Sequence, residues 1–140
     1  MSLLTIPRAR SVRGGPAWID IGLRYYLTAV CAGSAGVHAA LIQEHFEESS
    51  LLGSAFTVAA VALAAAALVV RQPRHDSWAF AAATVTLAVI GVSYLLSRST
   101  GIPVLIVQPE HVDPLGNVTT VAELAGAICG AVLMARKGKE

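Results

Sequence analysis

The stretch LLGSAFTVAAVALAAAALVV, residues 51–70, is almost wholly apolar and carries no charged side chain. A helix rises about 1.5 Å per residue, so about 20 apolar residues are needed to cross the hydrocarbon core of a bilayer. A backbone in lipid must satisfy its own hydrogen bonds, and a barrel would show alternating segments of about 10 residues rather than a continuous alanine-rich run. The stretch therefore predicts a transmembrane helix.

Three further stretches have the same apolar character, with at most one charged side chain each. They are residues 21–42, 78–96 and 118–135. We therefore expect an all-α bundle of four transmembrane helices that forms a single domain over residues 1–140. The connection over residues 99–117 is long for a helical bundle, in which about 2–8 residues are usual.

The composition supports this interpretation. Hydrophobic residues make up 55% of the 140-residue chain and charged residues 14%, whereas an ordinary soluble domain is about 25% charged. A formal net charge of +1 gives no basic field for holding phosphates. These values exclude a soluble globular enzyme, a disordered tail and a nucleic-acid binder. Cys31 and Cys129 both fall inside predicted spans, where we expect them to pack as small hydrophobes.

The basic residues predict the direction of the bundle. Arg and Lys concentrate on the cytoplasmic side of membrane proteins. With both termini cytoplasmic, nine of the ten basic residues lie on that side: Arg8, Arg10, Arg13, Arg24, Arg71, Arg74, Arg136, Lys137 and Lys139. Only Arg98 lies on the other side. We therefore expect a multi-pass protein of a bacterial inner membrane.

The acidic and imidazole side chains gather on the opposite side. The acidic loops fall outside, with Glu44, Glu47, Glu48, Glu110 and Asp113. The outer half of the bundle and its connections also hold Glu123, His38, His45 and His111. We therefore expect the polar chemistry of the protein on its extracytoplasmic side.

His38 and Glu123 are the two side chains most able to form a buried site. His38 and His45 are seven residues apart, nearly two turns, and so share one face of the first helix. Glu123 lies about 7–8 Å below the outer end of the fourth span, at a depth similar to that of His38. A carboxylate in hydrocarbon costs at least about 2.5–3.5 kcal/mol, so it should face the bundle interior and take a partner.

Three interpretations of this cluster stay open. The first is structural: Glu123 accepts a hydrogen bond from His38 or forms an ion pair with Arg98. The second is a transition-metal site, with His38 and Glu123 as ligands helped by His45, Glu44 or His111, since imidazole and carboxylate suit Zn, Cu, Fe or Mn. The third is a pathway for protons or a small solute, which would need polar groups in the cytoplasmic half as well.

The connection over residues 99–117 contains an apolar run, residues 104–107, between prolines. Such a run would not stay in water, so we expect it to fold back over the outer mouth of the bundle as a lid. The alternative is that it docks on the bundle or on another subunit. Asn117 is a candidate N-cap for the fourth helix.

Small residues suggest how the helices pack. Gly126 and Gly130 form a small-xxx-small face on the fourth span, and Gly33 and Gly36 offer the same on the first. We expect these faces to bring the first and fourth helices together, or to form a contact in a homo-oligomer or a larger membrane complex. The alternative function is accordingly that of an accessory subunit, in which the bundle supplies helix surface to a partner.

The outer end of the third span reads YLLSRSTGIP, residues 94–103. Together with His38, His45 and Glu123, this segment resembles small four-helix membrane proteins of high-GC bacteria whose activity is not established. The chain is similar to DoxX-like proteins in size and number of spans only. The resemblance implies a four-helix membrane fold and implies no site residue, cofactor or activity.

Overall fold

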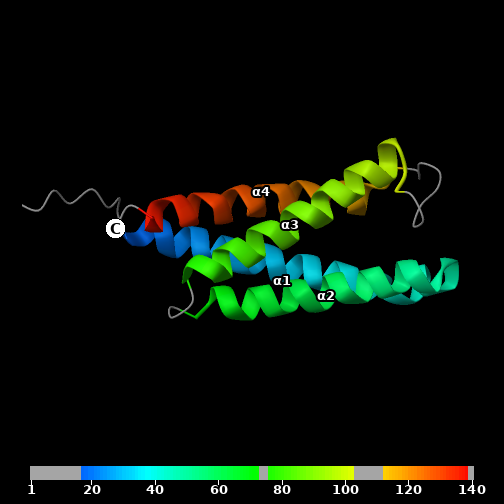
Figure 1. Cartoon of the computed structure of the whole chain (residues 1–140), viewed down its shortest axis with the longest axis horizontal. Coiled ribbons are helices and arrows are strands. Elements are labelled where there is room, and N and C mark those ends of the chain that lie inside the picture. Colours follow the sequence, from blue (N-terminus) through cyan, green and yellow to red (C-terminus); the bar gives the residue numbers. More distant parts are fainter. Residues whose placement is uncertain (1–16, 73–75, 103–111, 139–140) are drawn as a thin grey trace, which may run out of the picture.

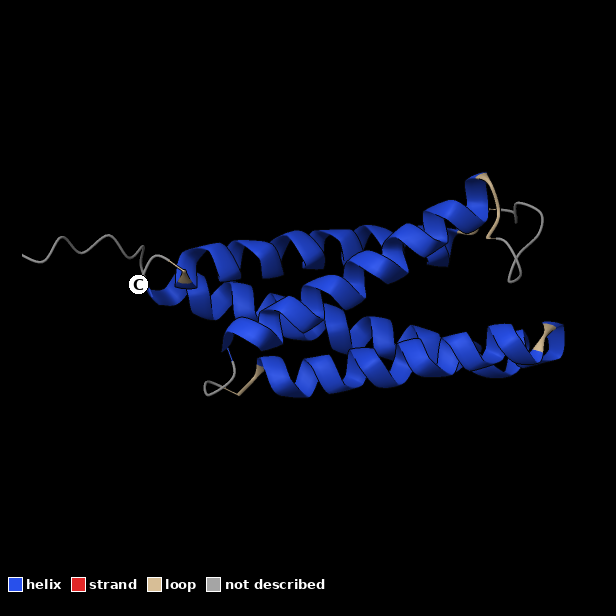
Figure 2. Ribbon diagram, viewed as in Figure 1, coloured by secondary structure: helices blue, strands red, loops and turns tan. Residues whose placement is uncertain are grey.

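The computed structural model describes residues 17–72, 76–102 and 112–138. Its four helices are α1 (Ala17–Glu48), α2 (Ser50–Val70), α3 (Asp76–Ser99) and α4 (Pro114–Lys137). Each of them is long and apolar enough to cross a membrane. The structure thus confirms the all-α, four-helix architecture expected of a multi-pass membrane protein (Figures 1 and 2).

The helices run antiparallel in sequence order (Figure 1). We call the end that holds the start of α1 and the end of α4 the proximal end, and the end that holds the α1–α2 turn the distal end. Helix α1 packs mainly on α2, and α3 mainly on α4, while contacts of α1 with α4 and of α2 with α3 join the two pairs. At the proximal end, Arg136 of α4 forms an ion pair with Asp20 of α1.

The close-packed core fills the proximal half of the bundle. Its largest fully buried apolar side chains are Leu27, Leu63, Val70, Phe80 and Leu87, contributed by α1, α2 and α3. Further buried alanines and cysteines, including Cys31 and Cys129, complete it, and both cysteines are free thiols. Towards the distal end the α3–α4 pair diverges from the α1–α2 pair (Figure 1). The bundle is therefore closed at one end and splayed at the other.

Two glycines let α4 approach its neighbours. A Cβ atom on Gly126 would lie within 3 Å of Val30 on α1 and Leu87 on α3. A Cβ atom on Gly130 would overlap the hydroxyl of Thr84 on α3. Because interfaces in membranes rely on close backbone approach, these positions explain why α4 can pack on both helices.

The predicted contact of the α1 glycines with α4 is wrong, whereas their contact in a homo-oligomer stays a prediction. Gly33 and Gly36 are exposed, and a Cβ atom on either would meet nothing within 4 Å. The neighbouring Ser34 and Ala35 are buried instead, so the helix turns its glycines away from α4. In an alanine-rich helix, residue size alone does not reveal which face is buried.

The predicted start of the fourth helix is also wrong. Asp113, not Asn117, is the N-cap of α4, and its side chain accepts a hydrogen bond from the Gly116 N–H at 2.6 Å. Pro114 follows at the first helical position, where its missing N–H costs nothing. The connection predicted over residues 99–117 is therefore shorter. The expected lid, residues 104–107, lies outside the described residues.

Replacing Gly130 by leucine should destabilise the bundle by about 1–3 kcal/mol, because the side chain would be forced into packed α3. Gly33→Leu is the matched control on an exposed face and should leave stability within about 0.5 kcal/mol. Unfolding of the detergent-solubilised variants, followed by helical circular dichroism, measures both. Equal stability of the two variants would contradict the assigned packing of α4.

Candidate functional site

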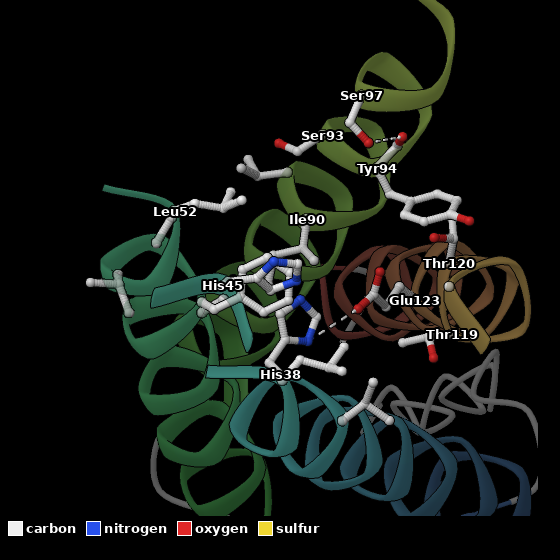
Figure 3. Close-up of a pocket in the computed structure, with 18 of the residues that line it drawn as sticks. His38, His45, Leu52, Ile90, Ser93, Tyr94, Ser97, Thr119, Thr120 and Glu123 are labelled. Carbon is white, nitrogen blue, oxygen red and sulfur yellow. Dashed lines mark hydrogen bonds and ion pairs between the residues drawn. The ribbon is translucent and has the colours of Figure 1, made fainter. Parts of the chain in front are cut away.

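A cavity of about 950 Å³ lies in the distal half, between the two helix pairs. Its walls are mostly apolar and come chiefly from α2 and α3; they include Leu52, Phe56, Val58, Ala59, Val85, Val89 and Ile90. Its polar groups lie towards α1, α4 and the distal end of α3, as Figure 3 shows. Small-molecule sites commonly measure about 300–1,000 Å³ and combine apolar walls with a few polar groups.

Glu123 is the buried charged residue of this cavity. It is 1% exposed, although it lies on a helix of membrane-spanning length. The Ser34 hydroxyl of α1 donates a hydrogen bond of 2.5 Å to its Oε1, and Nδ1 of His38 lies 4.0 Å from the same oxygen. Within the described part of the chain, no hydrogen bond reaches its Oε2. One carboxylate oxygen is thus held by the protein and the other is left for another group.

His38 is oriented by the helix that carries it. Its Nδ1 lies 2.9 Å from the carbonyl oxygen of Ser34, one turn earlier. A carbonyl can only accept, so the hydrogen is placed on Nδ1 and the neutral ring presents a lone pair at Nε2. Figure 3 shows His38 and Glu123 pointing toward one another, joined by a dashed line. The pair therefore offers a ligand two neighbouring acceptors, Nε2 of His38 and Oε2 of Glu123.

His45 continues the same wall towards the distal end. It lines the cavity as His38 does, which confirms that the seven-residue spacing places both rings on one face. The ring of Phe56 on α2 packs against both, with centroids 5.2 Å from His38 and 3.7 Å from His45. His45 Nδ1 also lies 3.1 Å from Oε2 of Glu48 at the helix end.

A second polar cluster joins α3 to the start of α4. Arg98 donates to Oδ2 of Asp113 at 3.1 Å and lies 4.8 Å from the centre of the Tyr94 ring. The Tyr94 hydroxyl is 3.2 Å from Oδ1 of Asn117. The hydrogen bond from the Gly116 N–H, with the charge of Arg98, holds the pKa of the Asp113 carboxyl below its usual value. This cluster holds α3 and α4 together in the distal half, where they diverge from α1 and α2.

The structure brings some of the predicted site residues together and does not describe others. It brings His38 and Glu123 together and places His45 on the same wall, whereas His111 lies outside the described residues. The partner described for Arg98 is Asp113, and the nearest partner of Glu123 is Ser34. No group of three or more His, Cys, Asp or Glu side chains among the described residues is arranged to hold a metal ion. The metal site stays a prediction.

The sequence analysis did not identify Ser34 as the direct partner of Glu123. The available signal was its position four residues before His38, one turn deeper on the same face. Many other serines and threonines occupy the spans, so the residue type alone was uninformative. Asp113 could have been found from the Asp–Pro pair, which is typical of an N-cap followed by the first helical residue.

Comparison of the chain with known protein families, curated proteins and solved structures found no match.

Removing the Ser34 hydroxyl should destabilise the fold by about 1–3 kcal/mol, because it leaves a buried carboxylate without its hydrogen bond. The double variant Ser34→Ala/Glu123→Leu lacks both polar groups. Its loss of unfolding free energy should be smaller than the sum of the losses in the two single variants. Ser99→Ala, at an exposed serine bonded to its own helix, is the control and should be near neutral. Unfolding of Ser34→Ala, Glu123→Leu, the double variant and Ser99→Ala in detergent gives the coupling energy. Additive effects would show that the two side chains do not interact.

The stabilising contribution of the Asp113 charge should be lost in acid. Its folded pKa lies below the ordinary value of 3.8, so the contribution is complete above about pH 5 and falls as the pH drops through the folded pKa. Asp113→Asn keeps a capping oxygen and should cost less than about 1 kcal/mol at pH 7, because the ion pair is partly exposed. The melting temperatures of the two proteins should converge as the pH falls through the folded pKa. A difference in melting temperature that widens in acid would contradict this assignment.

Proposed function

We propose that the protein binds a small lipid-soluble molecule with a polar end, in a site between helices α1 and α4 and the splayed faces of α2 and α3. In this proposal the bundle lies in a bacterial inner membrane with both termini in the cytoplasm, as the distribution of nine of ten basic residues favours. The cavity then lies in the outer leaflet.

The observation that carries the proposal is a cavity with apolar walls and one buried, half-satisfied carboxylate. The second oxygen, Oε2, is not among the described buried side-chain atoms that lack a hydrogen bond, which supports its being open to the cavity. Here Ser34 serves Oε1 alone among the described residues. The cavity beside it is large enough for the polar end of a ligand and its apolar body.

The direction from which a ligand arrives follows from the exposed cavity residues. Val58 on α2 and Val85 and Val89 on α3 line the cavity and are more than half exposed. In a bilayer these valines would face acyl chains, so the gap between α2 and α3 opens to lipid. An apolar molecule could enter there without crossing water.

The closed proximal half favours binding over passage through the bundle. Leu27, Val70, Phe80 and Leu87 are fully buried below the cavity. A transported solute would have to separate this packed core, whereas a bound ligand need not disturb it. The arrangement supports a binding protein whose ligand returns to the leaflet from which it came.

Ala59→Trp should block the cavity, because Ala59 lines it from α2. Ala65→Trp, on the exposed face of the same helix, is the matched control. The probe is dodecan-1-ol carrying a photoreactive diazirine, added to protein in lipid nanodiscs and mapped after illumination by peptide mass spectrometry. We expect labels on cavity residues of α2 and α3, reduced at least about fivefold by Ala59→Trp and unchanged by Ala65→Trp.

Two results would overturn the proposal. One is labelling spread evenly over all lipid-facing residues. The other is labelling of the cavity that Ala59→Trp and Ala65→Trp reduce equally. Circular dichroism of both variants confirms that each keeps its helices, so a loss of labelling can be assigned to the cavity.

A further inference from the structure

We infer that the ligand is an amphiphilic cation, with a protonated amine or quaternary ammonium group beside Glu123 and an apolar body between α2 and α3. This inference rests on the proposed function and narrows it to one chemical class. It draws on the charges around the cavity, on the free side of the Glu123 carboxylate and on the aromatic ring opposite.

The cavity shares part of its wall with a smaller hollow at the distal end, here called the vestibule. The vestibule measures about 490 Å³. Its lining residues are Leu41, Glu44, His45, Glu48, Arg98, Asp113 and Leu115. It shares five of them, Leu41, His45, Arg98, Asp113 and Leu115, with the cavity. A molecule in the cavity is therefore also within reach of the vestibule charges.

Negative charge predominates in these two spaces. The described lining residues supply four carboxylates, Glu44, Glu48, Asp113 and Glu123, against one guanidinium, that of Arg98. Asp113 already neutralises Arg98 at 3.1 Å. Leaving the imidazoles aside, three carboxylates remain among the described lining residues with no further Lys or Arg to match them. This excess would concentrate cations at the mouth and repel anions.

Glu123 supplies the contact for the cationic group deep in the cavity. Ser34 occupies Oε1, and Oε2 has no hydrogen bond within residues 17–72, 76–102 and 112–138. A buried carboxylate is strongly stabilised by a nearby opposite charge, because the surrounding dielectric is low. A neutral ligand could hydrogen-bond to Oε2, but only a cation would also offset the charge.

The remaining wall is compatible with a cationic group. Phe56 lines the cavity opposite α4, with its ring against His38 and His45. Aromatic faces attract ammonium groups through the ring quadrupole. The apolar walls exclude a bare hydrated cation and call for a hydrophobic body, which makes an amphiphile the ligand of best fit.

The test is competition against the photoreactive dodecanol in nanodiscs. Unlabelled dodecyltrimethylammonium and unlabelled dodecan-1-ol have the same chain length and differ in the polar end. For each protein, the ratio of their half-inhibiting concentrations gives the preference for the cation. Partition into the lipid is common to every variant, so the comparison of ratios between variants reports the protein alone.

Glu123→Gln should lower the cation preference at least about tenfold, because it removes the charge while keeping shape and hydrogen bonding. Inhibition by dodecan-1-ol should change less than about twofold. Glu47→Gln is the matched control, since Glu47 is exposed on α1 outside both spaces. It should keep the wild-type preference. The double variant Glu44→Gln/Glu48→Gln should lower the preference by about threefold, and less at high salt.

The outcomes separate the two proposals. If dodecan-1-ol labels the cavity but Glu123→Gln leaves the cation preference unchanged, the cationic ligand is wrong and the binding function stands. If neither amphiphile competes at the cavity, both are wrong. If Glu123→Gln loses its helical circular-dichroism signal, the double variant Glu44→Gln/Glu48→Gln decides. Its two residues are exposed at the end of α1, so their replacement should not unfold the bundle. An unchanged cation preference in this variant would overturn the inference.

Discussion

The distal half of this bundle depends on one buried hydrogen bond, from the Ser34 hydroxyl of α1 to the Glu123 carboxylate of α4. A carboxylate on a membrane-spanning helix cannot face lipid cheaply, so Glu123 fixes which side of α4 turns inward. Ser34 is short and brings the α1 backbone close. The contact lies between the packed proximal core and the open distal cavity, and it sets the point at which the two helix pairs begin to separate.

Side-chain size accounts for the difference between the two halves. In the proximal half, Gly126 and Gly130 allow α4 to lie against Val30, Leu87 and Thr84. In the distal half the two pairs diverge, and the α3–α4 pair is held together by a polar cluster instead. That cluster costs little in a membrane protein because it lies at the helix ends, where water can reach it. The bundle is therefore closely packed at the proximal end and open at the distal end.

Part of the candidate site could be predicted from the sequence. The seven-residue spacing of His38 and His45, and the depth of Glu123 in its span, follow from helix geometry and were sufficient to place the three at one site. The identity of the hydrogen-bond donor was not predictable, since several serines and threonines have comparable positions. The partner of Arg98 depends on where α4 begins, and Asp113 was assigned to a loop.

The number of helices, their approximate limits and their apolar character were determined by the sequence itself, because each depends on local composition and on the fixed thickness of a bilayer. Which face of each helix is buried was decided by tertiary structure alone. In spans so rich in alanine and glycine, almost any face can pack, and rotation of a helix changes its partners without changing its hydropathy. The outward turn of Gly33 and Gly36, the hydrogen bond of Glu123 to Ser34 and the cavity beside it all result from contacts between helices distant in the chain.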